Sequence, residues 1–146
     1  MPSGSFAACS PEALTAAKTC KQMNLARSIA GLIVGLAFIW IGIAHFTNTD
    51  AFNEIVPSYL GAPHFWTYSS GIFEIVLGAG IAIPAFRTIS ARYLVPLVLA
   101  MSLANLNMYL NDIPFNGNVL SGTGHAIRLL VQIVLLILLL WLGAIF

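Results

Sequence analysis

Four long apolar runs alternate with short polar segments along the chain, and each run is close to the length that crosses a bilayer. The runs cover about residues 28–46, 64–86, 91–110 and 125–146, and a membrane-spanning helix needs roughly 20 residues. Continuous apolar runs are typical of spanning helices, whereas a membrane β-barrel shows short alternating segments. The pattern therefore predicts an all-α membrane protein, built as a four-transmembrane-helix bundle.

The segment between the first two runs is too polar to span a membrane, and it predicts a short interfacial helix. Its apolar residues recur at helical spacing, which is typical of an amphipathic helix lying at the membrane surface. These residues are Phe52, Ile55, Val56, Tyr59 and Leu60. Pro57 and Pro63 are expected to end this helix before the second span. Between the last two runs, Asn111–Gly124 is rich in Asn, Gly and Pro and is predicted to be a loop.

Glycines in the first two runs predict close contacts between helices. Gly31 and Gly35 form a GxxxG pair in the first run, a spacing that lets two helix backbones approach each other. Gly71, Gly78 and Gly80 are expected to mark close packing of the second run in the same way.

The N-terminal residues 1–24 form a polar tail, ahead of a single transmembrane domain at residues 25–146. Ser10 and Pro11 are suited to begin a short helix, as N-cap and first helical residue, and we expect that helix to run through Lys21. The only two cysteines, Cys9 and Cys20, lie in this tail. Their spacing fits neither a CxxC redox pair nor the usual zinc sites, so we expect free thiols.

The basic residues predict the orientation of the bundle. Five of the six lie on one side of the membrane in the four-span topology: Lys18, Lys21, Arg27, Arg87 and Arg92. The loops on the opposite side carry Asp50, Glu54 and Asp112 instead. Because Lys and Arg accumulate on the cytoplasmic side of membrane proteins, both termini are predicted to be cytoplasmic.

The composition excludes a soluble globular domain. Hydrophobic residues make up 59% of the chain and charged residues only 8%, against about 25% charged in soluble domains. The mean hydropathy is +0.91. A net charge of +1 without a basic stripe gives no indication of nucleic-acid binding. The expected surroundings are therefore a lipid bilayer.

Glu74 is the main candidate for a functional residue because it lies well inside the second apolar run. An ionisable side chain at membrane depth is costly and usually faces a protein interior or a cavity. At about 1.5 Å of rise per residue, the polar residues of the other runs fall in the same outer half of the membrane. The expected cluster, and the candidate ligand-binding set, is His45, Glu74, Asn105, Arg128 and Gln132.

This cluster allows two interpretations. In the first it is structural: Arg128 holds Glu74, or Glu74 is neutral, while Asn105 and Gln132 bridge helices. In the second it is a site open to the outer side that holds a small polar molecule or moves a proton. A metal site is not predicted, although imidazole suits zinc, copper or iron, because His45, His64 and His125 each stand alone at a helix end.

The order and spacing of several short motifs are similar to those of a known family. The first motifs are Gly42-Ile43-Ala44-His45-Phe46, Phe52, Ile55-Val56-Pro57 and Ser70-Gly71-Ile72-Phe73-Glu74-Ile75. The later ones are Leu103-Ala104-Asn105-Leu106-Asn107-Met108-Tyr109 and Arg128-Leu129-Leu130-Val131-Gln132. From Gly42 to Gln132 the chain thus resembles the DoxX-like family of small four-helix membrane proteins.

The resemblance implies several functions. Members of that family are associated with a thiosulfate:quinone oxidoreductase and with membrane-bound oxidative-stress complexes, and one branch resembles an assembly chaperone for a receptor. Our first hypothesis is an accessory subunit of a membrane redox or other multisubunit complex, with a quinone as the cofactor to expect and protein partners or a second copy beside it. The expected location is a bacterial inner (plasma) membrane.

The resemblance leaves two alternatives to this hypothesis. One is a stand-alone oxidoreductase in which Glu74 is the acid/base and Arg128 holds an anionic group. The other is a chaperone for membrane-protein assembly, without chemistry. The spans contain no cysteine, which argues against thiol–disulfide chemistry inside the bundle.

Overall fold

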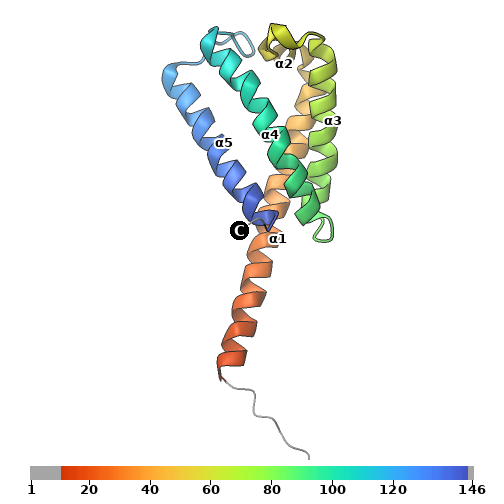
Figure 1. Ribbon diagram of the computed structural model, residues 1–146, viewed down its shortest axis with the longest axis vertical. Helices are drawn as coiled ribbons and strands as arrows, with labels where there is room; N and C mark the ends of the chain where they lie inside the picture. Colours follow the sequence, from red (N-terminus) through yellow and green to blue (C-terminus); the bar gives the residue numbers. More distant parts are fainter. Residues whose placement is uncertain (1–10, 145–146) are drawn as a thin grey trace, which may run out of the picture.

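The computed structural model describes residues 11–144, and these residues are helical apart from short connections (Figure 1). The elements in order are α1 (Pro11–Thr47), α2 (Thr49–Ile55), the 3-10 helix η1 (Ser58–Leu60), α3 (Pro63–Ala82), α4 (Arg87–Leu110) and α5 (Gly122–Leu142). Extended pairing within the described residues is limited to an isolated bridge between Phe115 and Asn118. The all-helical prediction is confirmed for this part of the chain.

Within the described residues, three helical segments are long and apolar enough to cross a membrane: Lys21–Thr47 of α1, α4 and α5. These segments indicate an integral membrane protein. α3 has 20 residues, about 30 Å at 1.5 Å per residue, so it has the length of a span. Its first half carries His64, Thr67, Ser69 and Ser70, which lower its hydropathy.

α1 extends further than the sequence pattern indicated. A helix begins at Pro11, as predicted, but it continues without interruption to Thr47 instead of ending near Lys21. Residues 12–30 contain no Gly or Pro and are rich in Ala, Leu, Lys and Gln, which favour helix. The first turns of α1 therefore project beyond the other helices (Figure 1). Cys9 lies outside the described residues, as does the side chain of Cys20.

The four long helices run alternately in opposite directions, so that the C-terminal end of α5 lies beside α1 and the start of α4. Arg27 Nη2 donates to the carbonyl oxygens of Leu142 at 2.7 Å and Trp141 at 3.4 Å. Arg92 Nε donates to Gly143 O at 3.0 Å. These two guanidinium groups satisfy terminal carbonyl oxygens of α5 and interact favourably with the negative end of its helix dipole. Arg27 and Arg92 thus lie at the same end of the bundle.

Glycines bring α1 and α3 into backbone contact. A Cβ added at Gly35 would lie 2.5 Å from Gly78 O, and one added at Gly78 would lie 2.8 Å from Gly35 O. Gly42 and Gly71 repeat the reciprocal contact, at 2.8 and 3.0 Å. A Cβ at Gly31 would be 2.9 Å from Ile81 O. The close helix contact predicted from the GxxxG pair is confirmed, and the partner is α3.

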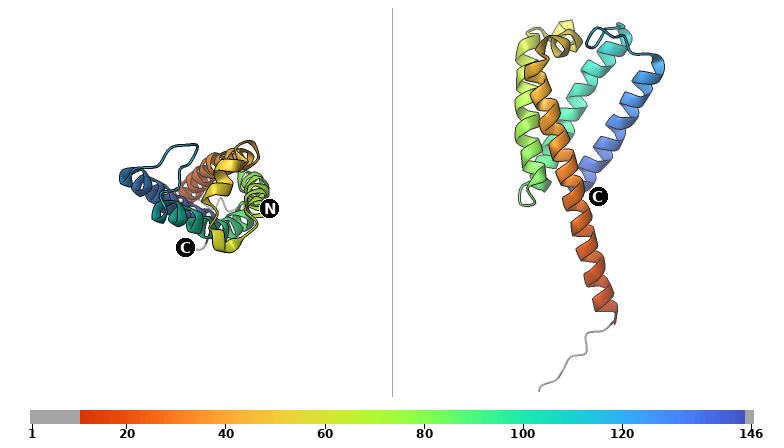
Figure 2. Two further views of the ribbon diagram at one scale, coloured as in Figure 1. Left: turned by 90° about the horizontal axis from the view of Figure 1, so that it is seen from above. Right: turned by 180° about the vertical axis from the view of Figure 1, so that it is seen from behind.

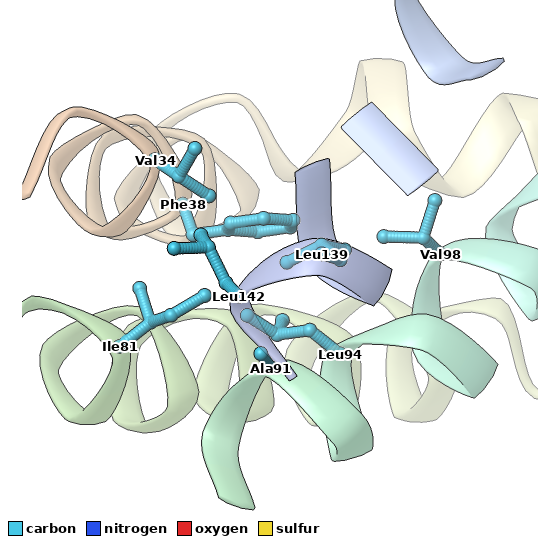
Figure 3. Close-up of a cluster of buried hydrophobic side chains, with 8 residues drawn as sticks. All are labelled: Val34, Phe38, Ile81, Ala91, Leu94, Val98, Leu139 and Leu142. Atoms are coloured by element: carbon cyan, nitrogen blue, oxygen red, sulfur yellow. The ribbon is translucent and has the colours of Figure 1, made fainter. Parts of the chain in front are cut away.

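The apolar core lies near the end of the bundle where α5 meets the other helices (Figure 3). It comprises Val34, Phe38, Ile81, Ala91, Leu94, Val98, Leu139 and Leu142. α5 contributes only its C-terminal turns to this core and leans away from α1 towards its N-terminus (Figures 1 and 2), while side chains of its N-terminal half still contact α4. The side chains of α5 in that region are therefore largely exposed.

The interfacial helix predicted between the first two spans is present in two pieces. α2 ends at Ile55 and η1 begins at Ser58, because Pro57 cannot continue the helix. Ala51 and Ile55 are buried, and Asn107 Nδ2 of α4 donates to Ile55 O at 3.1 Å. α2 thus packs over the end of the bundle opposite to the C-terminal end of α5, while Tyr59 of η1 is exposed.

Candidate functional site

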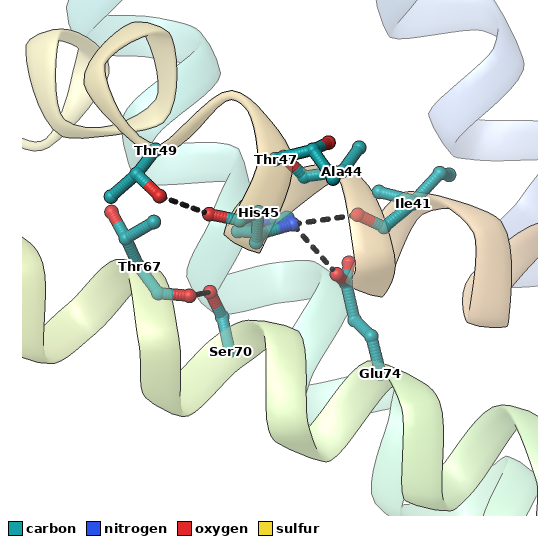
Figure 4. Close-up of polar contacts among 8 residues, drawn as sticks. All are labelled: Ile41, Ala44, His45, Thr47, Thr49, Thr67, Ser70 and Glu74. Atoms are coloured by element: carbon teal, nitrogen blue, oxygen red, sulfur yellow. Dashed lines mark hydrogen bonds and ion pairs between the residues drawn. The ribbon is translucent and has the colours of Figure 1, made fainter.

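The most deeply buried polar contact joins α1 to α3 (Figure 4). His45 Nδ1 lies 3.1 Å from Glu74 Oε2, and the two residues are only 2% and 1% exposed. The reciprocal Gly42–Gly71 contact lies one turn away and brings the two backbones close enough for this pair. The sequence therefore builds the pair from a glycine on each helix followed three residues later by an ionisable side chain.

The hydrogen bonds of this pair are incomplete. His45 Nδ1 is also 2.9 Å from the Ile41 carbonyl oxygen, so one ring nitrogen faces two oxygens. It carries at most one hydrogen. Glu74 Oε2 is accordingly left without a hydrogen-bond donor. A proton on the Glu74 carboxyl group, donated to His45 Nδ1 in the other tautomer, completes the contact to the carboxyl. The pair can thus hold a proton on either side chain.

A row of rings leads from this pair to Arg128. His45 stacks on Phe52 of α2 with ring centroids 3.8 Å apart, and Phe52 meets Phe115 edge to face at 5.3 Å. The Arg128 guanidinium lies over the Phe115 ring, 5.3 Å from its centroid, in cation–π geometry. Glu74 and Arg128 are therefore linked through aromatic side chains from α2 and from the loop before α5.

Arg128 does not pair with Glu74 as the structural interpretation of the cluster suggested. Its Nη1 donates to the Met108 sulfur at 2.8 Å, and its other described partner is the Phe115 ring. Within residues 11–144, the ion pair of Glu74 is with His45. Arg128 is half-buried with a thioether and a ring as partners, neither of which balances its charge.

Asn105 and Gln132 form a separate polar group between α4 and α5. Asn105 Nδ2 donates to Gln132 Oε1 at 2.9 Å. Gln132 Nε2 in turn contacts the Ser102 hydroxyl closely and lies 3.3 Å from Val98 O. The prediction that these two amides bridge helices is confirmed. They share no described contact with the His45–Glu74 pair.

The other two histidines lie apart from His45. His64 Nδ1 is 3.0 Å from Asn53 Nδ2, and the Thr67 hydroxyl donates to Asn53 Oδ1 at 2.8 Å. His125 lies edge to face with Tyr109 at 5.2 Å. In the part of the chain that the structure describes, no three His, Cys, Asp or Glu residues gather in a way that would hold a metal ion.

Phe52 and Phe115 are the two residues of this region that sequence reasoning did not assign to the site. Phe52 stood out as an apolar position of the short helix and as part of the motifs that carry the family resemblance, but not as a site residue, and Phe115 was only an apolar residue in a loop. Pro114 before it and Asn116-Gly117 after it are typical of a tight turn, and Asn116 and Gly117 have positive φ. The signal available in the sequence was therefore an aromatic residue, Phe115, placed within a tight turn.

Replacing Gln132 by Leu is expected to lower the free energy of unfolding by about 1 kcal/mol. The variant removes both the Asn105 and the Ser102 contacts, and hydrogen bonds between membrane helices contribute about 0.6 kcal/mol each on average. Reversible unfolding in mixed micelles measures the change. If Gln132→Leu lowered the free energy of unfolding as much as a variant that separates α1 from α3, this modest bridging role would be contradicted.

These features define a small helical membrane protein with a buried ionisable pair and a row of aromatic rings at one end. The chain belongs to the family described as a domain of unknown function, DUF8561, whose family model matches residues 34–143. The matched part contains every residue of the site described above. None of the curated proteins and none of the solved structures compared matches the chain.

Proposed function

We propose that this protein is a DoxX-like accessory subunit of a membrane complex, with four spans and both termini in the cytoplasm. The observation that carries the proposal is the combination, on α5, of exposed apolar side chains with a half-buried arginine. The apolar side chains of α5 are exposed along most of its length, yet the helix holds a half-buried Arg128 that has no carboxylate partner among the described residues. An arginine inside a span normally faces a protein interior or a cavity and pairs with an acid or a carbonyl.

The four-span topology is supported by the position of α3. It lies antiparallel to α1 along the glycine contacts from Gly31–Ile81 to Gly42–Gly71, so it occupies the same depth as the first span. The hydrogen bonds from Arg27 to the last carbonyls of α5 bring the start of the first proposed span beside the end of the last one. This supports an even number of crossings, and Arg27, Arg87 and Arg92 at that end favour the cytoplasm.

A partner subunit beside α5 would complete the bundle. The exposed apolar residues of α5 are Ile127, Leu129, Leu130, Val131, Ile133, Val134 and Ile137. Lipid covers such residues as well as protein does, so they do not themselves specify a partner. Arg128 does, because an acidic or carbonyl group from a neighbouring helix would supply what its present contacts lack. We expect such a group on a spanning helix of the partner, in the outer half of the membrane.

The aromatic row supports a second candidate, a ligand site in a redox complex. Phe52, Phe115 and Arg128 offer flat faces and a cation, and Glu74 with His45 offers a proton-holding pair. A quinone headgroup has a flat ring and carbonyl oxygens that accept protons on reduction, so it suits this set. In the stand-alone oxidoreductase alternative, Glu74 and Arg128 act on the two ends of the same ligand.

Native mass spectrometry of the protein gently extracted from its own membrane tests the proposal. We expect companion subunits in a fixed ratio, and we expect Arg128→Gln to reduce that complex at least about tenfold, because a buried charged contact is worth more than 1.4 kcal/mol. Glu54→Gln removes an exposed outer charge and serves as the control. A lone chain that carries a small bound mass would overturn the accessory role and favour the ligand site. Substoichiometric, transient clients would favour the chaperone alternative.

A further inference from the structure

A pocket of about 280 Å³ lies at the end of the bundle opposite to the candidate site. It is formed between α1 and the turn from α3 to α4. The lining residues are Asn24, Arg27, Ser28, Pro84, Arg87 and Thr88. Ligand pockets typically measure about 300–1,000 Å³, so this one is just below that range and has room for a small polar group.

Two arginines give this pocket a positive charge that none of its described lining residues balances. Arg27 and Arg87 line it together, and none of the six lining residues is a carboxylate. Arg87 is only 7% exposed. Its Nε donates to Ile81 O at 3.2 Å and its Nη1 to Ser28 Oγ at 3.4 Å, so both described partners are neutral. Two like charges held this close are unfavourable unless an anion lies between them.

The donors of these guanidinium groups are only partly used. Arg87 Nη2 and Arg27 Nε are buried and have no hydrogen-bond partner within residues 11–144. A buried donor on a charged group that lacks an acceptor costs more than a neutral one, and such groups are rare in folded proteins. An acceptor with several oxygens, placed in the pocket, would satisfy both. These unsatisfied donors therefore point to a ligand independently of the positive charge of the pocket.

The first turn of α4 adds a third attraction for an anion. Arg87 and Thr88 are its first two residues, and its N-cap, Phe86, has no side chain that accepts from the helix. The free N–H groups of a helix N-terminus and its dipole favour a negative group nearby. Arginine forks, in turn, match the geometry of phosphate oxygens.

We propose that this pocket binds a phosphate group, carried either by a phospholipid headgroup or by a soluble phosphate. It lies at the end of the bundle that holds Arg27, Arg87 and Arg92, and basic pockets between spans on the cytoplasmic side are suited to anionic headgroups. The bound phosphate would bridge α1 and α4. Arg27 also holds the last carbonyls of α5, so occupancy would tighten the junction of three helices.

Two arms of one experiment distinguish the sources of the phosphate. The protein is purified in a neutral detergent, and its thermal unfolding midpoint is followed as phosphatidylglycerol or inorganic phosphate is added, with phosphatidylcholine and chloride as references. An upward shift with phosphatidylglycerol alone assigns a headgroup. A shift with inorganic phosphate alone, or with both additions, shows that the pocket accepts a free phosphate. The proposal is overturned if neither addition shifts the midpoint more than its reference.

Variants show whether such a shift arises in this pocket. We expect Arg87→Gln to weaken phosphate binding at least about tenfold, since one charge-assisted contact is lost. Arg92→Gln removes the same charge at the same end but outside the lining, and we expect it to retain binding. Equal losses in the two variants would show a general effect of charge and would overturn the proposal.

Ser28→Asp separates loss of the ligand from loss of the fold. It places a carboxylate beside Arg87, at the position of the Ser28 hydroxyl that now contacts Nη1. We expect this variant to be at least as stable as the wild type without phosphate, and to show no further stabilisation when phosphate is added. If phosphate stabilised the Ser28→Asp protein as much as it stabilises the wild type, the assignment of phosphate to this pocket would be contradicted.

Discussion

Replacing Gly78 by Leu is expected to separate α1 from α3 and to lower the free energy of unfolding by about 3 kcal/mol. The added Cβ would lie 2.8 Å from Gly35 O, 2.9 Å from Phe38 Cβ and 3.1 Å from the Ile39 nitrogen. Two of these atoms belong to the α1 backbone and cannot turn aside as a flexible side chain does. Overpacking a tight interior typically costs 1–3 kcal/mol, and the remaining atoms of Leu place this site at the upper end of that range.

Reversible unfolding in mixed micelles, followed by circular dichroism, measures this effect. Gly122→Ala is the matched control, because a Cβ at Gly122 meets no atom within 4 Å, and we expect it to be neutral or slightly stabilising. Gly35→Leu should match Gly78→Leu, since the two glycines contact each other. A Gly78→Leu protein as stable as the Gly122→Ala protein would show that the α1–α3 contact is looser than described.

Much of the fold was readable from the sequence because each span carries its own local signal. Apolar length predicted the helices, Pro57 predicted the end of α2, and the GxxxG pair predicted a close contact of α1. The continuous path of α1 from Pro11 was the main departure. The polarity of the first residues suggested a separate tail, but polarity decides only whether a segment enters the membrane. Helix propensity, with no Gly or Pro between Pro11 and Gly31, decides where a helix stops.

The candidate site was predicted less completely, because the sequence gives the depth of a residue but not the direction in which it faces. His45 and Glu74 were expected at compatible depths, and the glycines near them make the pair. Arg128 and Gln132 are four residues apart and share a face of α5. That face turns towards α4, so they contact Met108 and Ser102 instead of Glu74. Which helices are neighbours is a tertiary property that no single span encodes.

The aromatic row illustrates the same limit. Phe52 and Phe115 lie in segments that connect spans, where neither depth nor periodicity fixes a partner. Their contacts arise because α2 folds back over the C-terminal end of α1, where the Thr49 hydroxyl donates to His45 O at 3.0 Å (Figure 4). A short connection with its own hydrogen bond thus places Phe52 on His45.

The His45–Glu74 pair is expected to give a coupling free energy of at least about 3 kcal/mol in a double-mutant cycle, the upper end for side chains in direct contact, because the double variant removes the buried polar partner that each single variant leaves behind. The cycle uses His45→Leu, Glu74→Leu and the double variant at neutral pH. We expect each single variant to lose about 3 kcal/mol, because the remaining polar partner stays buried without its contact. Unfolding in mixed micelles gives all four free energies. Asn105 and Gln132, a neutral pair between helices, provide a reference cycle with a smaller coupling.

The double variant decides what the pair is for. Two buried ionisable groups are costly to desolvate, and well-packed apolar residues in their place often restore or increase stability. If the double variant is at least as stable as the wild type, stability does not account for the pair, and its role is to hold a proton beside the aromatic row. An infrared carboxyl band that is present in the wild type and absent in Glu74→Gln would then identify that proton. A double variant that loses as much stability as both single variants together would show no coupling and would contradict the contact itself.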